Sequence, residues 1–193
     1  MLWFVWLVIA GIVVVGILLV VRRARPPAAP KQSPLLERTV FDLQLGDIVQ
    51  YFETDWVVEG WLTYRQDGFS WCEYLLQGGE RIRWLSVEED DVVRVAWLAP
   101  TKALSFEREP PPTLQFDSET YQRTDSGTAD MEREGNVRQH HAEQCRFFDY
   151  EGSNDKVLSI EEWDGQYEVT VGRCIHPSHL TLLPGSGERV YRN

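Results

Sequence analysis

The sequence is poor in basic residues and in cysteine. Lysine and arginine together number 19 against 30 aspartates and glutamates, and the formal net charge is −11. A field of this sign repels the phosphates of nucleic acids, so no nucleic-acid partner is expected. The three cysteines, Cys72, Cys145 and Cys174, are an odd number. They argue against a disulfide framework and for ordinary buried thiols.

Motifs for nucleophilic catalysis and for phosphate binding are also lacking. The chain contains no GxSxG elbow and no P-loop. Gly78-Gly79 falls between two predicted strands and precedes no helix, so a phosphate cradle is not expected there. The motifs therefore indicate no catalytic residue and no cofactor.

One segment lacks charge altogether. Residues 2–21 carry no charged or amide side chain and, at about 1.5 Å per residue, are long enough as a helix to cross a bilayer core. The run is longer than the apolar core of a cleaved signal peptide. Arg22, Arg23, Arg25 and Lys31 all follow it, which predicts a single-pass inner-membrane anchor with the N-terminus outside and the C-terminal part cytoplasmic.

Two proline-rich stretches divide the remainder of the chain. The first, "RPPAAPKQSP", predicts an extended spacer, and the second, "EPPPT", predicts a break between two β-rich parts. The expected organisation is a transmembrane helix (1–21), a basic linker (22–39), a first β half (40–100), a connection (101–113), a second β half (114–184) and a flexible tail (185–193).

Short alternating segments predict a mainly β fold. In the first half, turn signals at Asp67-Gly68 and Gly78-Gly79 separate five predicted strands: 47–51, 55–64, 69–76, 81–88 and 92–98. The second half has weaker candidates: 119–124, 127–134, 145–152, 156–163, 166–172 and 180–184. We expect two related halves, each resembling a small SH3-like barrel or a strongly bent sheet.

An internal repeat links the two halves. "RIRWLSVEED" (81–90) returns 73 positions later as "DKVLSIEEWD" (154–163). The same offset, without a gap, places Cys72 on Cys145 and the pair Glu88-Glu89 on Glu161-Glu162. The repeat predicts equivalent hairpins over residues 69–88 and 143–161.

The repeated glutamates allow two interpretations. Side chains alternate along a strand, so Leu85 and Val87, like Leu158 and Ile160, would be buried, and the glutamates would lie on the polar side or at the strand end. Glu89 and Glu162 are then expected to be mostly solvated. The alternative is a hydrolytic enzyme, in which the carboxyl groups of Glu73, Glu88 and Glu161 would converge in one pocket.

Two other groups of side chains are candidates for binding. The first group could form a metal sensor only if its side chains converged on one point: Cys174, His176 and His179, with His140, His141 and Cys145 as possible further ligands. The spacing of these residues is not that of a structural zinc site. The numerous aromatic residues either fill the core or line a groove for an extended peptide. The candidate partner-binding residues are Trp56, Trp61, Trp71 and Trp163.

The segments "FDLQLGDIVQY", "DWVVEGWLTY", "GFSWCEYLL" and "RWLSVEEDD", with "DYEGSNDKVLSIEEWDGQYEVTVG", resemble the bacterial family called domain of unknown function 4178. The resemblance covers roughly residues 40 to 184. It implies a mostly β domain without an established activity, encoded beside membrane and envelope-stress proteins. The expected function is a membrane-anchored cytoplasmic interaction or scaffolding module, in envelope stress or with a neighbouring membrane complex; the alternatives are the acidic hydrolase and the metal sensor.

Overall fold

A computed structural model describes residues 38–137 and 143–185, which belong to one compact unit. This part of the chain consists of β-strands with one short 3-10 turn, η1 (Pro177–His179). The strands are β1 (Ile48–Tyr51), β2 (Thr54–Gln66), β3 (Phe69–Gly78), β4 (Arg81–Glu89), β5 (Val93–Thr101), β6 (Thr113–Phe116), β7 (Glu119–Gly135), β8 (Gln144–Glu151), β9 (Lys156–Trp163), β10 (Gln166–Ile175) and β11 (Leu180–Leu183). The expected mainly β fold is confirmed.

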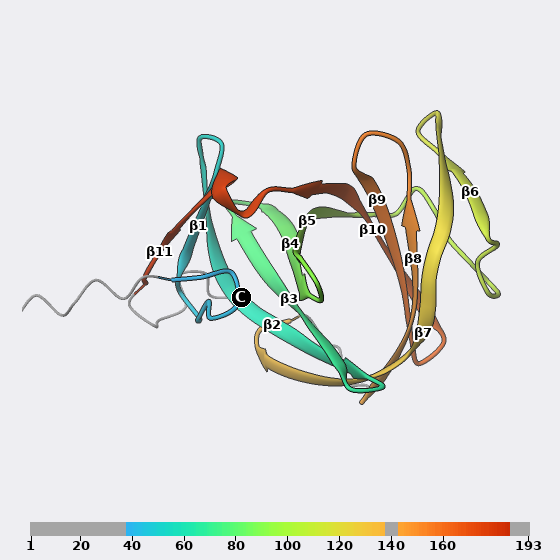
Figure 1. Cartoon of the computed structure of the whole chain (residues 1–193), viewed down its shortest axis with the longest axis horizontal. Coiled ribbons are helices and arrows are strands. Elements are labelled where there is room, and N and C mark those ends of the chain that lie inside the picture. Colours follow the sequence, from blue (N-terminus) through green and yellow to red (C-terminus); the bar gives the residue numbers. More distant parts are fainter. Residues whose placement is uncertain (1–37, 138–142, 186–193) are drawn as a thin grey trace, which may run out of the picture. The chain divides into compact units, whose positions relative to one another are not determined.

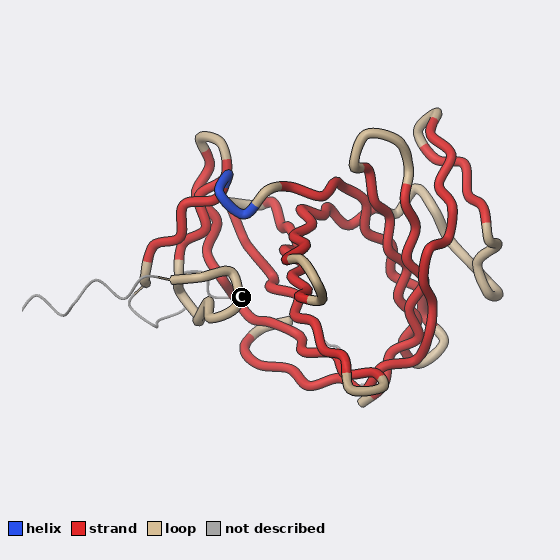
Figure 2. The backbone as a smooth tube through the Cα atoms, viewed as in Figure 1, coloured by secondary structure: helices blue, strands red, loops and turns tan. Residues whose placement is uncertain are grey.

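Eight of the strands close into an antiparallel barrel. Their order is β2-β3-β4-β5-β10-β9-β8-β7, and β7 pairs again with β2 (Figures 1 and 2). The short strands β1 and β6 lie outside the ring, on β2 and β7 respectively, and β11 pairs with β1. Closure leaves the eight ring strands without the unpaired edges that an open sheet exposes.

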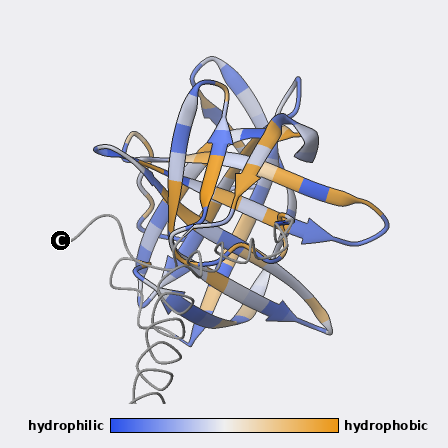
Figure 3. Cartoon of the chain, turned by 90° about the vertical axis from the view of Figure 1, so that its left-hand side faces the viewer, coloured by the Kyte–Doolittle hydropathy of each residue, from blue (hydrophilic) through white to orange (hydrophobic). Residues whose placement is uncertain are grey.

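Local sequence explains the strands and their turns. Polar and apolar residues alternate along the strands (Figure 3), which suits a sheet whose two faces have different surroundings. The β2–β3 turn is Asp67-Gly68, with φ angles of 50° and 88°, and the β9–β10 turn is Asp164-Gly165, with φ angles of 51° and 80°. Two successive positive φ values twist a hairpin in the favoured sense, and Asp-Gly adopts them readily.

The closing seam depends on two glycines. A bulge in β2 between Val58 and Gly60 separates the part that pairs with β1 from the part that pairs with β7. Gly60 lies opposite Gly135, and a Cβ atom on Gly60 would come within 2.6 Å of the Glu134 carbonyl oxygen. Gly135 also has a φ of 76°, which other residues rarely adopt. Side chains here would force the two strands apart.

The strand order confirms the duplication. The meander β2–β5 and the meander β7–β10 have the same order, and they meet at two antiparallel seams, β2 with β7 and β5 with β10. Leu85, Val87, Leu158 and Ile160 are all buried, as expected. Of the two forms expected for each half, the bent sheet agrees with the structure and the small barrel does not, because each meander supplies half of a single eight-stranded barrel and closes only against the other.

The ungapped offset of 73 holds for β4 and β9 but not for β3 and β8. Glu73 pairs with Ser86, whereas Asp149 pairs with Ser159, the counterpart of Ser86. Asp149 is therefore the structural equivalent of Glu73. The shift arises because only nine residues separate Asp149 from Ser159, three fewer than the twelve that separate Glu73 from Ser86.

The predicted equivalence of Cys72 and Cys145 is wrong for the same reason. Cys145 belongs to the core inside the barrel, while Cys72 packs against a cluster on the outside. Two further corrections concern strands: the candidates 119–124 and 127–134 are one continuous strand, β7, and β6 had not been predicted.

Buried apolar residues form three clusters. The barrel interior holds Leu62, Tyr64, Leu75, Trp84, Leu98, Ala129, Met131, Val137, Cys145, Phe147 and Trp163. A cluster on the outer face of the first half includes Val49, Trp56, Tyr74, Leu85 and Val87, and the matching cluster of the second half includes Leu114, Tyr121, Tyr150, Leu158 and Ile160. Since β1 and β6 carry Val49 and Leu114, each short strand helps to cover one outer face.

The predicted membrane span, residues 2–21, lies outside the described residues. Within residues 38–137 and 143–185, no helix has the length and apolar character needed to cross a bilayer.

Replacing Val87 by Asp tests the outer core of the first half. The Val87 side chain is 1% exposed, and an aspartate there would bury a carboxylate among apolar groups, so we expect the free energy of unfolding to fall by about 3 kcal/mol or more. Urea unfolding measures the change. Val92, in the turn after β4 and 67% exposed, supplies the control, and equal losses for Val87→Asp and Val92→Asp would contradict the assigned packing.

Candidate functional site

Part of the barrel interior is polar and lines a cavity of about 160 Å³ that opens to solvent on one side. Small closed barrels usually fill their interiors with apolar side chains. Here, by contrast, the polar lining consists mainly of acidic residues and hydroxyls: Glu73, Ser86, Glu88, Thr124, Asp125, Asp149, Glu151, Ser159 and Glu161. Apolar members of the interior core, including Leu98 and Phe147, form the rest of the wall.

The duplicated strands place the acidic groups in matching positions. Glu73 on β3 and Asp149 on β8 are equivalent, and each faces a serine across its hairpin. Glu88 on β4 and Glu161 on β9 are likewise equivalent, two residues beyond those serines. Because side chains alternate along a strand, the serine and the glutamate of each Ser-x-Glu segment point to the same side, into the cavity.

Hydroxyl groups hold two of the four carboxyls. The Tyr64 hydroxyl donates a hydrogen bond of 2.7 Å to Oε1 of Glu161, and the Ser159 hydroxyl donates one of 2.6 Å to Oδ1 of Asp149. Tyr64 also stacks on Trp71, with ring centroids 4.9 Å apart. None of Glu73, Asp149 and Glu161 forms an ion pair with a described cation.

The surroundings favour the protonated forms of these carboxyls. Burial, followed by the charge of Asp149, raises the pKa of Glu73 to about 8. Burial also raises the pKa of Asp149 to about 6, against the opposing hydrogen bond from Ser159. The pKa of Glu161 is raised by burial and then by the charge of Glu73. Near neutral pH the group therefore retains protons that isolated carboxyl groups would have lost.

Arg94 is the one cationic side chain among the described residues that line the cavity. Its guanidinium contacts Glu88 at 3.3 Å and Glu151 at 2.7 Å, and all three side chains remain partly exposed. The pKa of Glu88 is raised by burial, while Arg94 opposes that shift. Acceptor oxygens thus outnumber donors, and the volume suffices for a few water molecules or one small solute.

Comparison with known proteins identifies the family. The model of domain of unknown function DUF4178 matches residues 44–177. The chain belongs to the DUF4178 family. Uncharacterized proteins of Mycobacterium bovis and Mycobacterium tuberculosis (strain H37Rv) are each 32% identical to it over 196 residues, covering 92% of this chain and 92% of the relative. No solved structure matches the chain.

The segment "LGDIV" of the DUF4178 domain has a structural role. Asp47 is buried, and its carboxylate accepts hydrogen bonds from the backbone N–H groups of Gln44 (2.8 Å) and Gly185 (2.7 Å). Arg38 approaches the same carboxylate at 2.6 Å. Asp47 therefore fastens the two ends of the described chain to each other.

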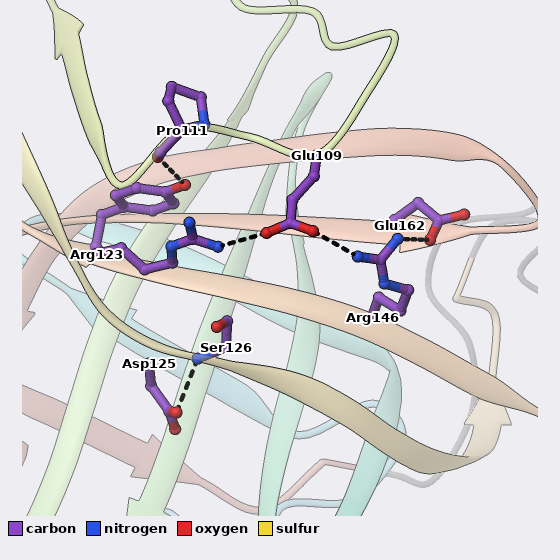
Figure 4. Close-up of polar contacts among 8 residues, drawn as sticks. Glu109, Pro111, Arg123, Asp125, Ser126, Arg146 and Glu162 are labelled. Carbon is purple, nitrogen blue, oxygen red and sulfur yellow. Dashed lines mark hydrogen bonds and ion pairs between the residues drawn. The ribbon is translucent and has the colours of Figure 1, made fainter.

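The structure brings together Glu73, Glu88 and Glu161, the carboxyls on which the enzyme alternative depended. The glutamates lie on the polar side of their strands, as expected, but Glu161 faces the barrel interior and not solvent. Glu89 is exposed, in agreement with the prediction. Glu162 was expected to be solvated, yet its side chain is only 16% exposed and pairs with Arg146, its cross-strand neighbour on β8 (Figure 4).

The four candidate tryptophans fall into two classes. Trp56 and Trp163 are buried, so neither is available for a partner. Trp61 and Trp71 are half-buried and line an open groove of about 740 Å³ beside β2 and β3. Trp71 borders the cavity as well.

The Cys/His candidates do not converge on one point. The Cys174 sulfur lies 3.9 Å from a guanidinium nitrogen of Arg94, while His176 bonds through Nδ1 to the Ser178 hydroxyl at 2.6 Å. Throughout 38–137 and 143–185, no three His, Cys, Asp or Glu side chains are placed to hold a metal ion. His140 and His141 lie outside the described residues.

Sequence reasoning missed Asp149, Arg94 and Tyr64 as members of the site. Asp149 was hidden by the ungapped repeat alignment, which set Arg146 against Glu73. The repeated Ser-x-Glu segments were a visible signal, because hydroxyl and carboxyl groups on one face of both strands suggest a common polar environment.

Stability should depend on pH through Glu73. In the window between the ordinary pKa of 4.5 and the raised pKa of about 8, the folded chain holds a proton that the unfolded chain has released. The free energy of unfolding therefore falls as pH rises through this window, by about 1.4 kcal/mol per pH unit for one fully shifted group. Glu73→Gln should flatten this fall and raise stability at pH 8.

Urea unfolding between pH 5 and pH 8 measures the slope. Glu89→Gln, an exposed change at the end of β4, is the matched control and should keep the wild-type slope. The assignment is wrong if Glu73→Gln leaves the slope unchanged or if both variants alter it equally.

Proposed function

We propose that the chain is a membrane-tethered binding module whose barrel cavity takes up a small molecule with several N–H donors. The observation that carries this proposal is the partly open cavity of about 160 Å³, whose described lining includes four buried or half-buried carboxyls and a single cation. A buried polar network stabilises a fold poorly, since desolvation offsets much of its attraction. A polar network at a position where apolar side chains would stabilise the fold better therefore supports a binding role.

The size and chemistry of the cavity define the ligand. Carboxyl oxygens accept hydrogen bonds, so amidine, guanidine, amine or amide groups complement Glu73, Asp149 and Glu161. The volume admits a group of a few heavy atoms and excludes a polymer. Glu88, Arg94 and Glu151 remain partly exposed and mark the side on which the cavity meets solvent.

Thermal unfolding of the full chain with methylguanidinium, methylurea and acetate tests the proposal. At ten times its Kd, a bound ligand adds about 1.4 kcal/mol and raises the Tm by about 3–5 °C. We expect donor-rich methylguanidinium to raise the Tm and acetate to leave it unchanged. Methylurea, which has the same shape without the charge, shows how much of the effect depends on charge.

A variant with a filled cavity controls for binding elsewhere. Ala96 faces the cavity from β5, and Ala96→Leu occupies much of the space, so it should abolish the rise in Tm. Ala103→Leu adds the same side chain to an exposed loop and should respond like the wild type. A full response in Ala96→Leu, or no response to any donor in the wild type, would overturn the proposal.

Acid–base hydrolysis is the second candidate function. It is favoured by the shared cavity of Glu73, Glu88 and Glu161 and by the separation between the pKa of Asp149, about 6, and that of Glu73, about 8. Under this alternative, Glu73→Gln abolishes turnover while binding persists. NMR of a bound compound over time separates the two, because a binding module leaves its ligand unaltered.

The membrane tether is part of the same proposal. The uncharged run at 2–21 and the arginines that follow it support a tether with the domain on the cytoplasmic side. Protease added to intact spheroplasts should therefore leave the C-terminal domain undigested, and permeabilised cells should lose it. Digestion in intact spheroplasts would reverse the orientation.

A further inference from the structure

Positive charge is distributed unevenly among the carboxyl groups of the cavity. Arg94, the one cation of the described lining, lies 3.3 Å from Glu88 and 2.7 Å from Glu151. Glu73 is 7% exposed and Glu161 is half-buried, and neither forms an ion pair with a cation of the described chain. The partly exposed carboxyls therefore have a counter-charge, whereas the inner ones do not.

Hydroxyl groups orient the inner carboxyls without neutralising them. The Tyr64 hydroxyl donates to Oε1 of Glu161 at 2.7 Å, and the Ser159 hydroxyl donates to Oδ1 of Asp149 at 2.6 Å. Within the described part of the chain, Oε2 of Glu161 and Oδ2 of Asp149 accept no hydrogen bond. These two oxygens remain for N–H donors that enter the cavity.

The small volume of the cavity opposes full ionisation of its carboxyls. Like charges within about 160 Å³ repel one another, and burial removes the water that would solvate them. Burial and then the charge of Asp149 raise the pKa of Glu73 to about 8, and burial and then the charge of Glu73 raise the pKa of Glu161. Two species can offset the excess negative charge here, a proton on a carboxyl group or a cation in the cavity.

The other groups near Glu73 and Glu161 supply almost no positive charge. They are Tyr64 on β2, Glu88 on β4, Arg94 on β5, Asp125 on β7, Cys145, Asp149 and Glu151 on β8, and Glu168 and Cys174 on β10. Arg94 is the one base among these described groups. Burial raises the pKa of the Tyr64 hydroxyl and of the Cys145 thiol, so both stay neutral. Neither His176 nor His179 lines the cavity.

We propose that the cavity admits its ligand as a monocation in exchange for a proton of Glu73 or Glu161, so that binding strengthens as pH rises. The inference rests on the binding function proposed above and specifies its ligand as an amidinium, guanidinium or ammonium group in preference to an amide. The proton passes from the carboxyl O–H to solvent, and N–H groups of the cation donate to the carboxylate that remains. A fall in pH near neutrality then releases the ligand.

Isothermal titration calorimetry of the full chain with methylguanidinium chloride tests the exchange. The guanidinium group keeps its charge near neutral pH, so a pH effect reports on the protein. With a carboxyl pKa of about 8, the Kd should fall by about eightfold between pH 6.5 and pH 7.5. Titrations in phosphate and in HEPES, whose heats of ionisation differ, count the protons. We expect about one proton to leave for each ligand bound at pH 7.

The double variant Glu73→Gln/Glu161→Gln removes both exchanging carboxyls. It should bind methylguanidinium at least about tenfold more weakly at pH 7.5 and release less than about a quarter of a proton. Glu89→Gln, an exposed change outside the cavity, should behave like the wild type. The four histidines of the chain are unaltered in both, so a pH effect that arose from them would persist in the double variant. Thermal unfolding verifies that the variants fold.

The outcomes separate the proton exchange from the binding function. If methylguanidinium binds the wild type with the same Kd at both pH values and releases no proton, the exchange is refuted and the binding module stands. Unchanged proton release from a folded double variant would also refute the exchange by these two carboxyls. If methylguanidinium does not bind the wild type at either pH, the binding function itself fails. Should the double variant not fold, the proton count of the wild type decides.

Discussion

The pairing of β2 with β7 across Gly60 and Gly135 is the contact on which the rest of the structure depends. It joins residues far apart in the chain, and it requires the two backbones to approach more closely than side chains would allow. Without it, β2–β5 and β7–β10 would form one open sheet, joined only at the β5–β10 seam, with β2 and β7 as its unpaired edges. With it, one face of this sheet becomes an enclosed interior, and the equivalent groups Glu73 and Asp149 share one space.

Much of the fold follows from local patterns. The alternation "RWLSVEE" and the turns at Asp67-Gly68 and Asp164-Gly165 locate strands and hairpins, since both depend on neighbouring residues. The pairing at the two seams cannot be predicted from local patterns. The seams β2–β7 and β5–β10 join segments that are distant in sequence, and no local preference specifies their register. The same limit explains the mistaken match of Cys72 with Cys145: the β8–β9 hairpin has three fewer residues beyond the Asp149–Ser159 pair than the β3–β4 hairpin has beyond the Glu73–Ser86 pair, and the ungapped repeat conceals this shift.

The acidic site was predictable only in part. The sequence shows that Ser86 and Glu88 share a face, as do Ser159 and Glu161, but alternation does not say whether that face meets water or the inside of a barrel. Closure of the barrel turns that face inward and thereby changes the pKa values of its carboxyl groups. An exposed glutamate keeps its ordinary pKa, whereas Glu73, enclosed beside Asp149, has a pKa of about 8. Because of the duplication, each half contributes its own carboxyl groups to the same cavity.

Trp71 belongs to the wall of both the cavity and the groove, and it stacks on Tyr64, whose hydroxyl holds Glu161. The emission of an indole responds to nearby charge and to the groups packed on it. A chain in which Trp71 is the sole remaining tryptophan of the domain would therefore carry its own optical probe. One spectrum, recorded without a label, would then register the protonation of Glu161 through the ring stacked on Trp71.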